Sequence, residues 1–210
     1  MTERKMTAWQ LDFSLRGLLA AVVETVRNPR DAAARLVAMD LPLAVIWTML
    51  GAVSAVSVVL VEGSLLLVRS PDEAGASTLP NPFLMFGLQL VLSALLASTT
   101  HQVGRVLGGK GRFGEALLLV TWLQVVMAGM QVLQVLLLLI APPLADVVGV
   151  AAGLLFIWLF AAFATVLHRF GSVGMGLATA FGSIVVIGLL LGLLFSMAGV
   201  QLPVATDGVM

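Results

Sequence analysis

Five long apolar stretches, separated by short polar segments, dominate the hydrophobic pattern of this chain. Each is close in length to the roughly 20 helical residues that cross a bilayer core about 30 Å thick. The pattern therefore predicts an all-α membrane protein with five transmembrane helices. The predicted spans cover residues 41–61, 82–100, 116–140, 147–167 and 173–198.

The polar segments between the spans contain residues that typically end or begin helices. Residues 70–82, SPDEAGASTLPNP, separate the first two spans. Pro142 and Pro143 are expected to close the third span, because proline disrupts a helix interior, and Asp146 is expected to cap the fourth. Residues 199–210 are expected to be a disordered tail.

Two shorter elements precede the first span. Residues 15–26 place apolar side chains at every third or fourth position, which predicts a helix with one apolar face. Asn28 and Pro29 match the N-cap and first position of a second short helix. We expect residues 1–40 to form a cytoplasmic segment whose two helices lie in the membrane interface. The alternative is a small cytosolic hairpin that packs on the loops.

The composition agrees with a membrane protein. Of the 210 residues, 60% are hydrophobic and only 10% are charged, whereas a soluble domain carries about 25% charged residues. The formal net charge is zero, so no whole-chain attraction to nucleic acid is expected. The chain has no cysteine, which excludes thiol nucleophiles and thiolate metal sites.

The lysines and arginines are distributed unevenly, and this predicts the orientation. With the N-terminus inside, only Arg69 falls in an external loop. The remaining ten then face the cytoplasm, as the positive-inside rule requires. The prediction is a cytoplasmic N-terminus and an external C-terminus. The ten cytoplasmic cations are Arg4, Lys5, Arg16, Arg27, Arg30, Arg35, Arg105, Lys110, Arg112 and Arg169.

The loop after the second span is the most polar short stretch in the middle of the chain. It contains a histidine, three cations and several glycines, and it is predicted to be cytoplasmic. Its charges suggest a docking site for a partner or an anionic lipid headgroup; the alternative is a loop whose cations only set the topology. The candidate docking residues are His101, Arg105, Lys110, Arg112 and Glu115.

Glu115 has two further expected roles. It lies at the start of the third span, where a carboxylate favours the N-terminal end of a helix dipole. It is also placed to pair with Arg105 or Arg112.

Part of the same loop imitates a nucleotide-binding motif. Residues 104–110, GRVLGGK, match the start of a phosphate-binding loop, but Gly111 stands where a serine or threonine would hold magnesium. The stretch also follows a membrane helix rather than a strand. Nucleotide binding is therefore not predicted.

Polar residues inside the spans are few. Ionisable residues are nearly absent, which weighs against a proton-coupled transporter. The third span carries Gln124, Gln131 and Gln134, which are expected to form interhelical hydrogen bonds. Lining of a polar cavity is the alternative.

Small residues in the last two spans suggest close helix packing. Gly149 and Gly153, and likewise Gly188 and Gly192, form G-x-x-x-G pairs. Packing within the chain is the expectation, and a dimer interface is the alternative.

The chain shows no pattern of catalytic residues. It lacks G-x-S-x-G, H-E-x-x-H and paired intramembrane aspartates. We therefore predict no catalytic, metal or cofactor site, and we expect the protein not to be an enzyme.

The order of these parts resembles the Yip1-domain membrane proteins in their bacterial form. The resemblance rests on three features. They are the amphipathic segment VRNPRDAAARLVAMDLP before the first span, the stretch HQVGRVLGGKGRFGEALLLVTW after the second span, and the five-span plan. It covers roughly residues 20–198. The family implies a cytoplasmic N-terminus. Its eukaryotic members bind prenylated small GTPases and partner Yip-type proteins. The eukaryotic Asp-Leu-aromatic-Gly-Pro element is reduced here to Asp40, Leu41 and Pro42, so GTPase binding is not carried over.

Together these observations predict a non-enzymatic, multi-pass scaffold or adaptor in a bacterial inner membrane. Residues 41–198 would form the Yip1-like domain. Its expected partners are the lipid bilayer, anionic headgroups, and another membrane protein or a second copy of the chain. A small transporter or channel subunit that uses the glutamine stripe is the alternative, and membrane-shape sensing by the N-terminal helices is a third.

Overall fold

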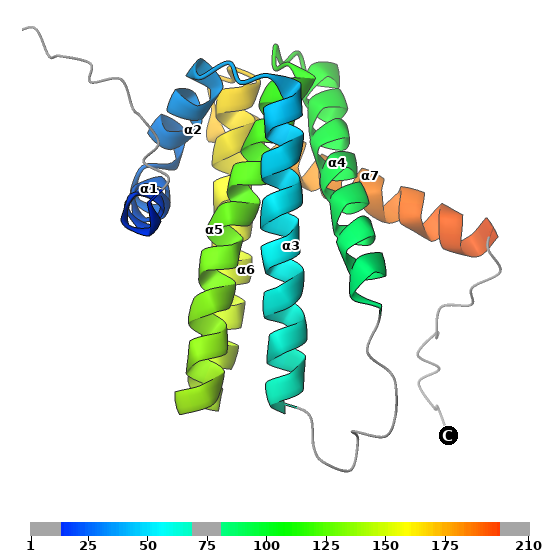
Figure 1. The fold of residues 1–210 in the computed structure, drawn as a ribbon. Helices are drawn as coiled ribbons and strands as arrows, with labels where there is room; N and C mark the ends of the chain where they lie inside the picture. Colours follow the sequence, from blue (N-terminus) through cyan, green and yellow to red (C-terminus); the bar gives the residue numbers. More distant parts are fainter. Residues whose placement is uncertain (1–13, 69–80, 198–210) are drawn as a thin grey trace, which may run out of the picture.

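The computed structural model describes residues 14–68 and 81–197, and within these ranges it is entirely helical (Figure 1). Five of the helices are long and apolar enough to cross a membrane. The predicted fold class, five spans preceded by two short helices, is confirmed. The helices are α1 (Leu15–Arg27), α2 (Pro29–Ala38), α3 (Leu43–Val68), α4 (Pro82–Val106), α5 (Phe113–Ile140), α6 (Pro142–Leu167) and α7 (Val173–Met197). Several predicted features lie outside the described residues. They are most of the 70–82 loop, the predicted tail, and the cations Arg4, Lys5 and Arg69.

The turn between α5 and α6 is tighter than the sequence predicts. Helix α5 ends at Ile140, and α6 already begins at Pro142, with Ala141 as its N-cap. Asp146 therefore lies inside α6, and the prediction that it caps this helix is wrong. Pro142 and Pro143 fit the first turn of a helix because the amide hydrogens there have no helical acceptor.

The five spans alternate in direction, so three of their connections meet at one end of the molecule (Figure 1). This end holds residues 39–42, residues 107–112 and residues 168–172. We call residues 107–112 the hinge and this end of the bundle the hinge end. Helix α5 is central, because it packs against α1, α2, α3, α4 and α6. Helix α7 packs on α4 and α6 and leans away from the others (Figure 1).

The core of the bundle lies in its hinge-end half. Every residue from Glu115 to Leu123 in α5 is buried, because neighbouring helices surround this part of α5. The facing part of α6, residues 159–165, is buried as well. Toward the other end, large apolar side chains such as Ile140 and Val147 are exposed. In a bilayer those side chains face lipid tails, which are as apolar as the side chains themselves, so they need no protein contact.

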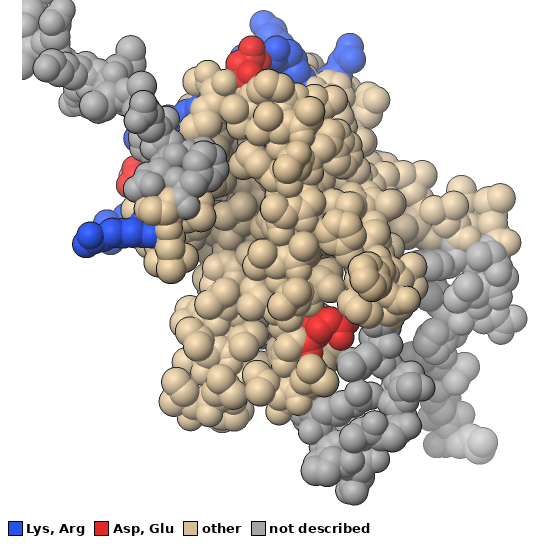
Figure 2. All heavy atoms as spheres, viewed as in Figure 1, with Lys and Arg blue, Asp and Glu red and all other residues tan. Residues whose placement is uncertain are grey.

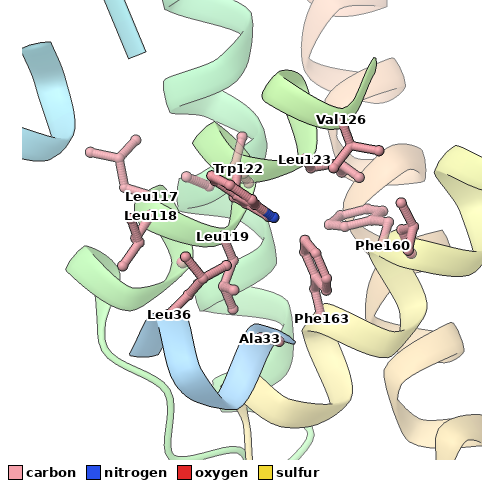
Figure 3. Close-up of a cluster of buried hydrophobic side chains, with 14 of the residues drawn as sticks. Ala33, Leu36, Leu117, Leu118, Leu119, Trp122, Leu123, Val126, Phe160 and Phe163 are labelled. Atoms are coloured by element: carbon pink, nitrogen blue, oxygen red, sulfur yellow. The ribbon is translucent and has the colours of Figure 1, made fainter. Parts of the chain in front are cut away.

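The two short helices join this core. Ala33 and Leu36 of α2 are buried against α5 and α6, where Phe163 also packs (Figure 3). The indole Nε1 of Trp122 donates a 3.0 Å hydrogen bond to the hydroxyl of Thr25 in α1. The sequence patterns did not indicate these contacts with the spans. The amphipathic pair is thus packed on the side of the transmembrane bundle.

Only one of the four glycines in the predicted pairs, Gly149, packs closely against another helix, where a Cβ would lie 3.0 Å from Gln134 of α5. A Cβ atom at Gly176 would collide with Thr165 and with the Ala161 carbonyl of α6. By contrast, nothing lies within 4 Å of a Cβ built at Gly188 or Gly192. The expectation that this pair packs within the chain is therefore wrong, because α7 has diverged from its neighbours at that point.

Candidate functional site

The hinge begins where α4 ends in a left-handed residue. Gly108 has φ +85°, a conformation that glycine adopts without a Cβ penalty. Its amide donates to the Arg105 carbonyl, and the Gly109 amide donates to the Gly104 carbonyl at 2.7 Å. These bonds satisfy carbonyls that the end of the helix leaves open. The chain thereby turns sharply into the extended residues before α5.

Three other glycines of this region surround the end of α6. A Cβ at Gly104 or Gly109 would overlap the His168 ring, and a Cβ at Gly111 would press on Leu167. The apparent phosphate-binding glycines thus make room for a side chain of the same protein. This is the structural reason for the glycine-rich composition of the hinge.

His168 fixes the hinge to the turn after α6. Its side chain is only 1% exposed, and Nε2 lies 3.1 Å from the Thr100 carbonyl, so we assign the proton to Nε2. The Lys110 amide donates to the His168 carbonyl at 3.3 Å. Nδ1 is buried and has no hydrogen-bond partner. Burial lowers the pKa of His168, an effect that outweighs the hydrogen bond to Thr100.

A group of four charged residues lies on top of this contact. The buried carboxylate of Glu115 accepts hydrogen bonds from the Arg112 amide and the Arg112 side chain, both at 3.0 Å. It also lies 3.5 Å from the Arg169 guanidinium. Arg112 reaches across to Asp40, which links α5 to the end of α2. The predicted Glu115–Arg112 pair is present, whereas Arg105 is not its partner among the described residues.

Arg169 completes the closure of the hinge end. It has φ +57°, an uncommon conformation for a residue with a side chain. This conformation reverses the chain after α6 and directs the guanidinium back toward the hinge. There it donates a 3.0 Å hydrogen bond to the Lys110 carbonyl as well as approaching Glu115.

The predicted docking residues separate into two groups. Arg112 and Glu115 are committed to the ion-pair group, and His101 is half-buried with its ring 6.4 Å from that of Phe113. The side chains of Arg105 and Lys110 are exposed, and neither has an ion pair with any residue that the structure describes. Figure 2 shows cations gathered at this end of the molecule.

A pocket of about 250 Å³ opens at the hinge end beside the ion pairs. Its walls are mostly apolar and come from the end of α2, the start of α3 and the start of α5. Asp40, Arg112 and Glu115 supply its polar groups, and the backbone of Gly114 borders an unfilled space. The apolar lining residues are Val37, Leu41, Leu43, Ile46, Phe113 and Leu118.

The glutamines of α5 do not form one stripe. Gln124 bonds to Ser93, to Ser54 at 3.5 Å and to Gln89 at 3.4 Å, which joins α3, α4 and α5. Gln134 faces Gly149 of α6 instead. Gln131 lines a separate pocket between α3 and α4. The expected interhelical bonding is thus found at Gln124.

No group of three or more His, Cys, Asp or Glu side chains that could hold a metal ion occurs within residues 14–68 and 81–197. Asp40, Arg112, Glu115 and Arg169 at the hinge end are instead paired with one another. The same end of the molecule also presents two exposed cations, Arg105 and Lys110, and a mostly apolar pocket.

A family model for the Yip1 domain matches residues 23–195. The chain belongs to the Yip1-domain family. The match begins within α1 and ends within α7, so it includes α2, the hinge and nearly all of the five spans. A search of curated proteins and a search of solved structures each found no match.

Several residues of this Yip1 domain escaped the sequence analysis. His168 was not identified as a candidate, and Arg169 was counted only among the cytoplasmic cations, because their partners Thr100 and Lys110 lie 68 and 59 positions earlier in the chain. Asp40 was noted only as a remnant of a family element. The sequence offered two signals that the loop packs against another part of the chain. These were the positive charge of Arg112, which favours an acidic partner, and the number of glycines, which allow close approach.

Proposed function

We propose that this Yip1-domain protein is a non-enzymatic scaffold or adaptor of a bacterial inner membrane that binds another membrane protein at its hinge end. The observation that carries the proposal is the mostly apolar pocket at the same end of the bundle as the exposed cations Arg105 and Lys110. The matching ligand is a partner segment that presents an apolar side chain next to an acidic residue. Arg112 and Glu115 then hold the site in shape rather than bind the partner.

Three features support binding rather than chemistry. Asp40, Arg112, Glu115 and Arg169 at this end form ion pairs and hydrogen bonds with one another, and these join α2, α5 and the turn after α6. The pocket has mostly apolar walls, as binding sites for side chains do. The two exposed cations lie at the end of the bundle that the distribution of charges predicts to be cytoplasmic.

The experiment is purification from the native membrane in lipid nanodiscs, followed by mass spectrometry of what co-purifies. The proposal expects a stoichiometric protein that is lost from a variant carrying Arg105→Glu and Lys110→Glu. A variant with Arg16→Glu and Arg30→Glu makes the same charge change on exposed positions of α1 and α2, and it should retain the partner. Topology is checked in both, because cations also set orientation.

A second variant tests the pocket itself. Gly114→Leu fills open space, since nothing lies within 4 Å of its Cβ position. It should release the partner without lowering the melting temperature. If the chain purifies alone, or if all three variants keep the same partner, the adaptor proposal is wrong.

A further inference from the structure

The pocket that contains Gln131 lies far from the hinge end. It has a volume of about 170 Å³ and lies between α3 and α4, with α5 behind it. Three of its polar residues are Glu62, Gln89 and Gln131. They stand 19, 17 and 18 residues from the hinge-side ends of α3, α4 and α5 at Leu43, Val106 and Phe113.

These three side chains therefore lie at one depth. A helical rise of 1.5 Å per residue places all of them about 27 Å from the hinge-side helix ends. A hydrocarbon core is about 30 Å thick, so this level is close to the far boundary of the core. Figure 2 shows acidic side-chain atoms at the surface in this half of the molecule. The pocket is thus at the depth where lipid headgroups and hydrocarbon meet.

The polar groups of the pocket are mainly acceptors. The carboxylate of Glu62 is half-buried and has no ion pair within the described ranges. The amide oxygen of Gln131 is buried and has no hydrogen-bond partner. Gln89 points its amide nitrogen toward Gln124, so its oxygen is left for other donors. A buried acceptor without a donor costs about 1–3 kcal/mol, which a ligand that donates hydrogen bonds would recover.

We infer that this pocket binds a primary ammonium group attached to a short apolar segment. An ammonium carries one positive charge and three N–H donors, which complement one carboxylate and two amide oxygens. Apart from Ser57, the remaining walls are apolar, and they suit the carbon atoms next to the nitrogen. These residues are Val58, Val61, Leu65, Met85, Leu88 and Leu92.

Other cations fit the pocket less well. A quaternary ammonium has no N–H donor and is recognised by aromatic rings, and none of the residues that line this pocket is aromatic. A bare metal ion would leave most of the volume and the apolar walls unused. The ammonium can come from an aminophospholipid headgroup or from a free alkylamine, since both present the same group.

The test compares lipids and amines on the purified, full-length protein. Native mass spectrometry is performed from nanodiscs that contain equal amounts of phosphatidylethanolamine and phosphatidylcholine, with and without butylammonium. Retained phosphatidylethanolamine in excess of phosphatidylcholine identifies the lipid source. A melting temperature raised by butylammonium, without selective lipid retention, identifies the free amine.

Two variants decide whether the pocket is responsible. Glu62→Gln removes the charge and should weaken ammonium binding at least tenfold, while Gln131→Leu, which removes the unpartnered acceptor, should weaken it less. Asp146→Asn removes a carboxylate on the same side of the bundle but outside the pocket, and binding should be unchanged. Equal retention of both lipids with no effect of butylammonium, or equal binding by the Glu62→Gln variant, overturns the inference. The hinge-end proposal is unaffected by either result, because the two sites do not share residues.

Discussion

Glycines 104, 109 and 111 are required because they have no Cβ atom. Each leaves space for His168 or Leu167, and any side chain there would displace the turn after α6. Gly108 differs, because it is required for its left-handed conformation. A sequence motif that resembles a phosphate-binding loop is therefore explained by helix packing.

Gly104→Ala should destabilise the protein by about 1–3 kcal/mol, the usual cost of overpacking a closed site. The matched control is Gly87→Ala in the same helix, where nothing lies within 4 Å of the added atom. That change should be neutral or stabilising by about 0.5–1 kcal/mol, because alanine favours the helix. Thermal unfolding followed by tryptophan fluorescence measures both. Equal melting temperatures for the two variants would contradict the packing explanation.

His168 should make stability depend on pH. Burial lowers its pKa below the ordinary value of 6.5, so the unfolded chain takes up a proton that the folded chain does not. The contribution of neutral His168 to the free energy of unfolding is therefore fully present above pH 6.5 and is lost as the pH decreases below 6.5. The wild-type melting temperature should decrease from pH 7.5 to pH 5, and His168→Asn should depend less on pH. His101→Gln is the control for the neighbouring histidine, and a wild-type curve that is flat over this range would refute the expectation.

At the scale of elements, one carboxylate holds three segments together. Glu115 has a side chain only 5% exposed and contacts arginines from the hinge and from the turn after α6. Asp40 is exposed and pairs with the same Arg112. The two acids therefore share a partner but differ in burial. We expect the buried Glu115 to contribute more to the free energy of unfolding than the exposed Asp40.

Glu115→Gln should cost about 1.5–3 kcal/mol, the usual range for hydrogen bonds to a charged group. Asp40→Asn should cost at most about 1 kcal/mol, because exposed ion pairs contribute little and asparagine tolerates the positive φ of 44° at this position. Chemical unfolding in detergent at two salt concentrations distinguishes them. A larger loss for Asp40→Asn than for Glu115→Gln would show that burial does not set the ranking.

The elements themselves were largely readable from the sequence, and their contacts were not. Apolar runs, Pro29 and the glycine-rich hinge indicated the helices, because these signals are local. The start of α6 was misplaced because Asp146 resembled an N-cap, whereas a proline pair suffices for the first turn. Pairing of Trp122 with Thr25, or of His168 with Thr100, joins positions too distant for any periodic pattern.

At the scale of the whole molecule, orientation is still a prediction from charge. The described cations lie at the hinge end or on α1 and α2, which agrees with a cytoplasmic location for both. Arg105 and Lys110, which the adaptor proposal uses as docking residues, were predicted from the sequence because they are charged. The ammonium pocket was missed because Glu62, Gln89 and Gln131 come from three helices.

Because the natural chain has no cysteine, single cysteines test the orientation directly. Lys110→Cys at the hinge should react with a membrane-impermeant thiol reagent in inverted vesicles only. Ala141→Cys, between α5 and α6, should react in intact spheroplasts only. The reverse pattern would place the hinge end outside and would remove the cytoplasmic partner from the adaptor proposal.

The hinge-end half of the bundle is packed and cross-linked by ion pairs, whereas α7 diverges toward the other end. Changes in bilayer thickness are usually accommodated by helix tilt. We therefore expect the tilt of α7 to change more readily at the far end of the bundle than at the hinge end. A thicker or thinner membrane should then alter the cross-section of the protein more in one leaflet than in the other, so that it acts on the lipids as a wedge whose angle follows the membrane around it.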